Sequence, residues 1–175
     1  MTNYFIVPGL GNSGEGHWQT YFEKSAANFM RIEQKDWDAP KSADWVENIS
    51  QVIADFDPET VVLIGHSLGC TAIANWANTS TIKIKGALLV APSDVEAPKY
   101  NFDTPGFQKV PLERINFKTI TVASTNDEWV SIERAEFFAK NWGSEFINIG
   151  SAGHINAASG YGDWMAGLEI LKTLG

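Results

Sequence analysis

One apolar run and the pentapeptide after it constrain this chain more than any other feature. The run Thr60-Val61-Val62-Leu63-Ile64 has the length and the β-branched content of a buried strand, and Gly65-His66-Ser67-Leu68-Gly69 follows it directly. A stretch of helical character then begins without a linker, from about Leu68 to Ala77. A strand, a sharp turn and a helix in immediate succession are typical of chains that build a parallel sheet.

The same alternation continues along the whole sequence. Further runs suited to buried strands lie at 4–7, 86–91, 117–123 and 146–149, and stretches of helical period lie at about 18–29, 42–56, 131–142 and 161–174. We expect Ser42 to cap its helix and Gly143 to end another. Residues 92–116 form the longest segment without periodicity and are predicted to be a loop. The pattern predicts one α/β domain over residues 1–175, with a mostly parallel sheet of about five to six strands between layers of helices.

Charge and composition exclude several classes of partner. The chain has 13 Lys and Arg against 21 Asp and Glu, which gives a net charge of -8. An acidic surface repels nucleic-acid phosphates and anionic lipids, so we expect neither nucleic-acid nor membrane binding. The lone Cys70 has no disulfide partner, and the N-terminus lacks the features of a signal peptide. We therefore expect a soluble cytoplasmic protein, either a monomer or a weak homodimer.

The pentapeptide predicts a nucleophilic serine. A Gly-x-Ser-x-Gly sequence between a strand and a helix is the pattern of a nucleophile elbow, in which a tight turn lifts the serine hydroxyl above the carboxyl end of the sheet. Gly65 and Gly69 provide the space that such a turn needs beside Ser67. The alternative is a glycine-rich turn in which Ser67 only caps the following helix.

A serine hydroxyl needs a base to remove its proton, and the chain has three histidines. His66 lies inside the elbow, where its side chain is expected to point away from that of Ser67. His17 belongs to the glycine-rich loop after the first strand. His154 follows the last predicted strand, and loops at the carboxyl ends of parallel strands meet in one crevice. We therefore predict His154 as the base.

The base in turn needs a carboxylate to orient it. Asp127 follows the strand at 117–123, and the order Ser67, Asp127, His154 is the one expected for a nucleophile elbow on such a sheet. Asp94, which follows the preceding strand, and Glu128, which is adjacent to Asp127, are the rival candidates.

Two backbone N–H groups are predicted to stabilise the developing oxyanion: that of Leu68, directly after the nucleophile, and that of Leu10 in the loop after the first strand. The glycines of that loop fit a dinucleotide-binding motif only formally, because no helix starts cleanly there and no acidic residue closes a second strand. The histidines lack the spacing of metal ligands, so we expect no metal and no cofactor. Four aromatic residues are candidates for a substrate pocket, with packing in the core as the alternative: Trp18, Trp129, Phe102 and Phe107.

Taken together, the motifs resemble those of a known family, the small serine hydrolases of the α/β-hydrolase fold that are similar to retinoblastoma-binding protein 9. The resemblance covers nearly the whole chain. Its motifs are Pro8-Gly9-Leu10-Gly11, His17-Trp18, Gly65 to Gly69, Leu89-Val90-Ala91-Pro92, Asn126-Asp127, Glu133-Arg134-Ala135, Trp142-Gly143, Gly153-His154-Ile155-Asn156 and Ser159-Gly160-Tyr161-Gly162-x-Trp164.

The resemblance implies an α/β-hydrolase fold and a triad of Ser67, Asp127 and His154 that cleaves small esters, and amides as a further option. The sequence departs from the family at two places. Glu128-Trp129-Val130 replaces the usual turn after the acid, which affects the shape of the pocket. Ala72 stands where a Leu-x-Cys-x-Glu partner-binding motif needs glutamate, so we expect no partner of that type.

The residues therefore predict a cofactor-free serine hydrolase, a carboxylesterase that takes a small-molecule ester substrate and forms an acyl-enzyme. Two alternatives stay open at this point. The same triad would serve an aminopeptidase or amidase, and a hydrolase scaffold without activity would serve as an interaction protein.

Overall fold

The computed structural model describes residues 1–175 and contains one sheet of six parallel strands. Along the sheet the strands lie in the order β2-β1-β3-β4-β5-β6. Their bounds are β1 Asn3–Val7, β2 Phe29–Arg31, β3 Val61–His66, β4 Gly86–Val90, β5 Lys118–Ala123 and β6 Glu145–Asn148. Because all six strands are parallel, their carboxyl ends share one edge of the sheet, and the loops that follow them gather there.

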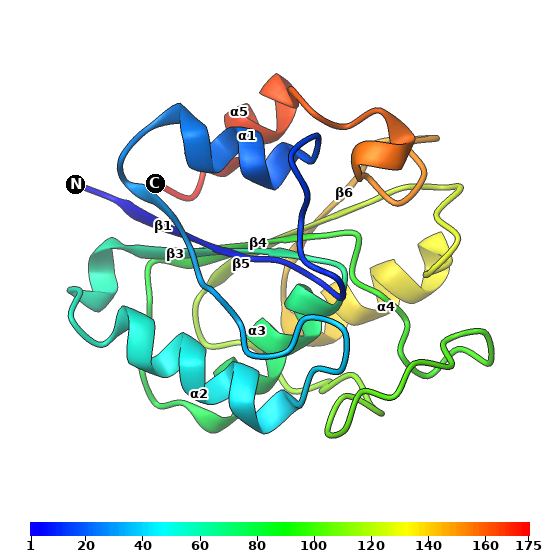
Figure 1. The fold of residues 1–175 in the computed structure, drawn as a ribbon, viewed down its shortest axis with the longest axis horizontal. Coiled ribbons are helices and arrows are strands. Elements are labelled where there is room, and N and C mark those ends of the chain that lie inside the picture. The colour runs from blue at the N-terminus through cyan, green and yellow to red at the C-terminus, as the bar shows by residue number, and fades with distance from the viewer.

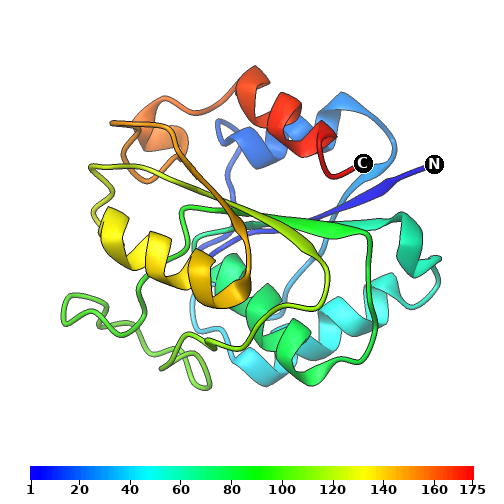
Figure 2. The ribbon, with the colours of Figure 1, turned by 180° about the vertical axis from the view of Figure 1, so that it is seen from behind.

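Five helices cover the two faces of this sheet. They are α1 Trp18–Ser25, α2 Ser42–Ile53, α3 Leu68–Thr79, α4 Ile132–Trp142 and α5 Met165–Lys172. Figures 1 and 2 show α1 and α5 together on one face and α2, α3 and α4 on the other. The three-layer α/β arrangement predicted from the sequence is confirmed.

Each face of the sheet has its own apolar core, because buried strands alternate their side chains between the two faces. Phe5 and Leu63 pack towards α2, α3 and α4 in a core of 27 buried residues. Ile6 and Ile64 pack towards α1 and α5 in a core of 15 buried residues. The central strands are thereby fixed on both sides, which makes their carboxyl ends a firm base for the loops above them.

Two features between the start of α1 and the start of α2 differ from the sequence prediction. The helix predicted over 18–29 ends at Ser25, because Ala26 adopts an extended conformation, and Phe29–Arg31 forms the edge strand β2 instead. Ser42 is the first residue of α2 and not its cap. Its hydroxyl accepts a hydrogen bond from Nδ2 of Asn75 at 3.0 Å and so joins α2 to α3.

The later helices follow the sequence prediction more closely. Ser131 caps α4 by accepting a hydrogen bond from the N–H of Arg134, and Gly143 ends the helix with a φ of 70°. The last helix begins at Met165 and not near residue 161, because the chain turns at Gly160 with a φ of 83° before it reaches α5. No helix has the length and apolar character needed to cross a membrane.

Candidate active site

Ser67 lies in a strained turn between β3 and α3. Its φ of 55° and ψ of -124° fall outside the regions that residues with a Cβ ordinarily adopt, and such a conformation persists only where its surroundings enforce it. Its N–H donates to the carbonyl of Val90 at the end of β4, at 3.0 Å. The predicted elbow is therefore present, and the backbone is held against the neighbouring strand.

The two glycines of the pentapeptide allow the chain to pack closely around this turn. A Cβ on Gly65 would lie 3.1 Å from the backbone of Cys70 on α3. A Cβ on Gly69 would overlap the carbonyl oxygen of Val7 and lie 2.7 Å from that of Pro8. The loop after β1 thus presses directly against the start of α3.

The close packing at Gly69 predicts how a single added methyl group changes the stability of the fold. Gly69→Ala is expected to destabilise the fold by about 3 kcal/mol or more, because the new Cβ meets main-chain oxygens that belong to a buried strand end. Gly14→Ala is the matched control, since a Cβ there meets nothing within 4 Å. Urea unfolding of both variants measures the difference, and equal stabilities would contradict the close packing of the elbow.

Asp127 and His154 form a hydrogen-bonded pair beside the elbow. The Nδ1–H of His154 donates to the Asp127 carboxylate, with both oxygens 2.9 Å from Nδ1. The Asp127 side chain is 0% exposed, and the N–H of Trp129 also donates to it at 2.8 Å. A carboxylate held in this way fixes the orientation of the imidazole and leaves Nε2 free to accept a proton.

The loop that carries His154 is tied to its neighbours by several hydrogen bonds. Ser124, after β5, accepts from the N–H of Ala152 at 2.9 Å, and Asn126 accepts from the N–H of Gly153 at 2.8 Å. Ser159 accepts from the N–H of His154 itself at 3.2 Å. These bonds from main-chain N–H groups to side-chain oxygens join the loops after β5 and β6 and hold Asp127 and His154 in place relative to each other.

Neither rival carboxylate contacts His154. Asp94 is bound in a bidentate manner by the guanidinium of Arg134 on α4, at 2.9 and 3.1 Å. Arg134 also reaches Glu96 at 2.6 Å, and it thereby fastens the start of the 92–116 segment to α4. Glu128 is exposed to solvent. Of the three acids considered from the sequence, the structure brings only Asp127 to the imidazole.

Ser67 and His154 line the same cavity, but the Ser67 hydroxyl is bonded to another residue. Its Oγ lies 2.7 Å from Oγ of Ser93, a residue that is 2% exposed and follows β4. No hydrogen bond joins Ser67 to His154 in this structure. Hydrogen bonds between a nucleophile and its base are often long or poorly aligned before substrate binds. The structure thus brings Ser67 and His154 to one cavity without a direct contact between them, and Asp127 lies behind His154.

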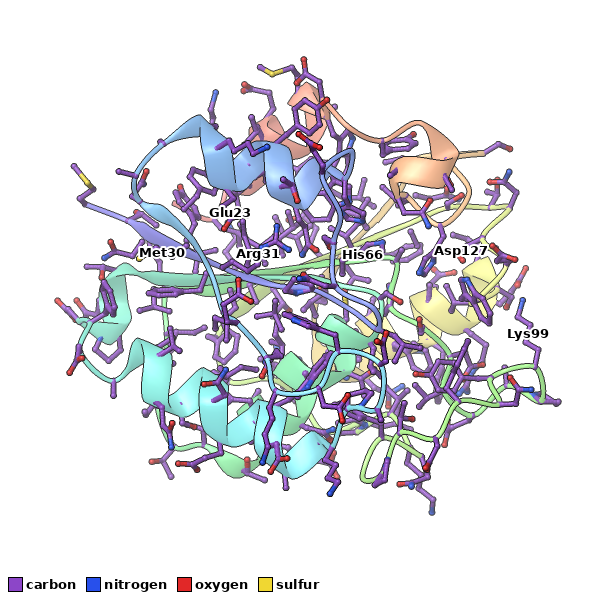
Figure 3. The ribbon with its side chains drawn as sticks, viewed as in Figure 1. Glu23, Met30, Arg31, His66, Lys99 and Asp127 are labelled. Atoms are coloured by element: carbon purple, nitrogen blue, oxygen red, sulfur yellow. The ribbon has the colours of Figure 1, made fainter.

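His66 lies close to the imidazole of His154. The Nε2–H of His66 donates to the main-chain carbonyl of His154 at 2.9 Å, and its ring centre is 4.8 Å from that of the His154 ring. Burial lowers the pKa of His66 well below its usual value. Figure 3 shows His66 and Asp127 at the same end of the sheet. His66 therefore supports the main chain of the predicted base and stays neutral near pH 7.

The two predicted oxyanion donors are both unpaired. Leu68 is the first residue of α3, where an N–H group has no partner inside the helix. Neither this N–H nor that of Leu10 donates a hydrogen bond within the chain. A Cβ on Gly9 would lie 3.2 Å from the nitrogen of Leu68, so the loop that carries Leu10 passes over the start of α3. Both N–H groups are therefore without a partner in the chain, and their binding of an oxyanion stays a prediction.

The cavity has a volume of about 270 Å³, and two of the four predicted pocket residues line it. Trp129 and Phe102 stand on its wall, with ring centres 5.6 Å apart. The prediction was wrong for Trp18 and Phe107, which are fully buried away from the cavity. Trp18 donates from its indole N–H to the carbonyl of Ile155 at 2.8 Å, whereas Phe107 packs on Trp45 of α2.

The cavity is also lined by several residues that were not predicted from the sequence to belong to it. Tyr100 extends the aromatic wall, with its ring centre 5.1 Å from that of Phe102. The others are polar: Asn12, His17, His66, Ser93 and Asn156. The aromatic-rich composition of the 92–116 segment is the one sequence signal that could have identified Tyr100.

The family model for serine hydrolases matches residues 4–173. No curated protein matches this chain. A YdeN-like hydrolase from Pectobacterium atrosepticum is 33% identical, with a TM-score of 0.87 over 99% of this chain and 90% of that one.

Two more distant structures share the fold. The ydeN gene product of B. subtilis is 18% identical, with a TM-score of 0.87 over 99% of this chain and 98% of that one. Est816, an N-acyl homoserine lactone degrading enzyme, is 13% identical, with a TM-score of 0.77 over 99% of this chain and 93% of that one.

The resemblance stated from the motifs is thus confirmed for the hydrolase family, and the likeness to retinoblastoma-binding protein 9 stays a prediction. The family match spans residues 4–173, a range that contains Ser67, Asp127 and His154. This chain belongs to the serine hydrolase family.

Proposed function

We propose that this protein hydrolyses small, uncharged carboxylic esters through an acyl-enzyme on Ser67. The observation that carries the proposal is the combination of a serine in a strained elbow with a histidine bonded to a covered carboxylate, around one cavity. A serine that only capped a helix would need neither the strain nor the buried Asp127–His154 pair.

Each step of the reaction has a residue to perform it. The Ser67 hydroxyl turns from Ser93 towards Nε2 of His154, gives up its proton there and forms a bond from Oγ to the ester carbonyl carbon. The N–H groups of Leu68 and Leu10 bind the resulting oxyanion. His154 then passes the proton to the departing alcohol as the carbon–oxygen bond breaks, and a water molecule repeats the sequence to release the acid.

The cavity supports a small and uncharged substrate. Its 12 lining residues include no Asp, Glu, Lys or Arg, and its volume is about 270 Å³. A charged group would lose its hydration there without gaining an ion pair. The aromatic side chains of Phe102 and Trp129 provide an apolar surface for a short acyl chain or a flat leaving group.

A substrate series tests this proposal. We expect p-nitrophenyl acetate and butyrate to be hydrolysed with a higher kcat/KM than p-nitrophenyl octanoate, which exceeds the cavity, and than aminoacyl p-nitroanilides. A fluorophosphonate probe should label the protein and abolish turnover in parallel. Preference for the anilides would favour an amidase instead. A native protein that neither reacts with the probe nor cleaves any substrate would favour the interaction protein.

A further inference from the structure

The hydroxyl of Ser93 makes its one hydrogen bond with the predicted nucleophile. Its Oγ lies 2.7 Å from Oγ of Ser67, and neither hydroxyl bonds to any other group of the chain. Ser93 is 2% exposed, so its hydroxyl has little access to water as a substitute partner. In this structure the two hydroxyls are therefore each other's partner, and that of Ser67 is engaged by Ser93 and not by His154.

Main-chain contacts on both sides hold Ser93 in place. Two residues earlier, Ala91 has a φ of 49°, a conformation that an alanine keeps only where its surroundings enforce it. The N–H of Ala91 donates to the carbonyl of Val122 on β5 at 2.8 Å. One residue after Ser93, the N–H of Asp94 donates to the carbonyl of Trp129 at 3.0 Å. Ser93 is thus a fixed partner for the hydroxyl beside it.

The main chain of Ser67 is also fixed, so only its side chain is free to move. Its N–H is bound to the carbonyl of Val90, and a Cβ on Gly9 would lie only 2.8 Å from the Cβ of Ser67. The hydroxyl can leave Ser93 by rotation about the Cα–Cβ bond of Ser67, from one staggered position to another. This rotation has to come before Nε2 of His154 can accept the proton.

We propose that Ser93 holds the Ser67 hydroxyl in a resting orientation, and that breaking this hydrogen bond is part of the barrier to acylation. An interaction that the free enzyme makes and the transition state lacks slows the reaction, because it stabilises only the starting state. Ser93 is then a positioning residue whose removal makes Ser67 attack faster. This inference rests on the proposed esterase function and names a group that regulates its nucleophile.

Ser93→Ala is expected to raise the rate of acylation about three- to tenfold, which corresponds to the net strength of one neutral hydrogen bond. The gain is measured as kcat/KM for p-nitrophenyl acetate and p-nitrophenyl butyrate, and as the second-order rate constant of labelling by a fluorophosphonate. Because the bond is broken within the enzyme, the gain should be nearly the same for all three reagents. A better fit in a widened cavity would instead favour the larger ester.

The second half of the reaction provides an internal control. In the acyl-enzyme, Oγ of Ser67 is esterified, so Ser93 no longer decides where it points. A stopped-flow record of p-nitrophenol release separates the rate constant of acylation from that of deacylation. We expect Ser93→Ala to raise the first and leave the second unchanged. A variant that acted only through the stability of the fold would not divide its effect in this way.

Two further variants complete the series. Ser93→Cys keeps a side chain of similar size, but a thiol is a weaker hydrogen-bonding group, so its acylation rate should lie between those of the unmodified protein and Ser93→Ala. It also carries the test if the alanine variant fails to fold, which urea unfolding shows. Ser25→Ala removes an exposed hydroxyl at the end of α1 and should leave both rate constants unchanged.

The outcomes distinguish this inference from the proposed function. If Ser93→Ala and the unmodified protein acylate at the same rate, the role of Ser93 is refuted while the esterase stands. A slower acylation also refutes it, because Ser93 would then assist the attack and not delay it. If the unmodified protein cleaves neither ester and does not react with the fluorophosphonate, the proposed function itself fails.

Discussion

Replacing Ser67 with alanine is expected to lower kcat for ester hydrolysis on the order of 10⁶-fold, which leaves only the residual rate that substrate binding and the oxyanion donors provide. Alanine removes the hydroxyl that would attack the carbonyl carbon and leaves every other predicted catalytic group in place. The fold should persist, because alanine has the same Cβ as serine and takes no additional space in the turn at φ 55°. Initial rates with p-nitrophenyl butyrate measure the loss, and circular dichroism checks the fold.

Ser25→Ala is the matched control for this variant. Ser25 is the exposed last residue of α1, and its hydroxyl only donates to the carbonyl of Phe22 at 2.7 Å. Its kcat should equal that of the unmodified protein. If Ser67→Ala retained a substantial share of the activity, the nucleophile would have to be another group, and Ser93, 2.7 Å away, would be the first to test.

Asp127→Asn is expected to lower kcat by about 10⁴-fold with little change in KM. The asparagine amide would donate an N–H to Nδ1 of His154 and so place the imidazole proton on Nε2. That tautomer cannot accept the proton of Ser67. The volume of the side chain is unchanged, which matters because the Asp127 side chain is 0% exposed.

Glu128→Gln and Asp94→Asn complete this experiment. Glu128 is exposed and adjacent in sequence, so its variant should behave like the unmodified protein. Asp94→Asn removes one partner of Arg134 and should reduce stability far more than kcat. If Asp94→Asn lost activity to the extent expected of Asp127→Asn, the assignment of the acid would be wrong.

The sequence was sufficient to predict the strands that position the candidate site. Runs such as Val61 to Ile64 are buried on both faces, so they appear in the sequence as continuous apolar stretches, and the strand ends follow from them. Because Ser67, Asp127 and His154 each follow a predicted strand, the parallel topology was enough to place them at the same edge of the sheet. Their catalytic roles stay predictions that the variants above test.

Short-range signals were insufficient where tertiary contacts decide the structure. The three residues of β2 form a strand because they pair with Tyr4, Phe5 and Ile6 of β1, and no period can be detected in so short a segment. Trp18 and Phe107 have the same side-chain chemistry as Trp129 and Phe102. Only the packing of α1 and α2 decides that the first two belong to the cores.

The position of His17 could not be foreseen for a similar reason. His17 caps α1 through Nδ1 and also lines the cavity, and both depend on how the loop after β1 folds back onto β2. Arg31 holds that loop by donating to Asn12 at 2.6 Å and to the carbonyl of Ser13 at 3.1 Å. A contact between a strand residue and a loop about 20 positions earlier leaves no periodic trace in the sequence.

The loop after β1 and the segment after β4 contribute to the cavity in different ways. The first is pressed against the elbow at Gly69 and carries Leu10, whereas Tyr100 and Phe102 stand on coil that Arg134 fastens near its start. Substitutions in the segment after β4 can therefore change which substrates fit the cavity without moving the groups that are predicted to react with them. Directed evolution towards new substrates should accumulate changes around residues 100–102 and leave Gly9 and Gly69 untouched.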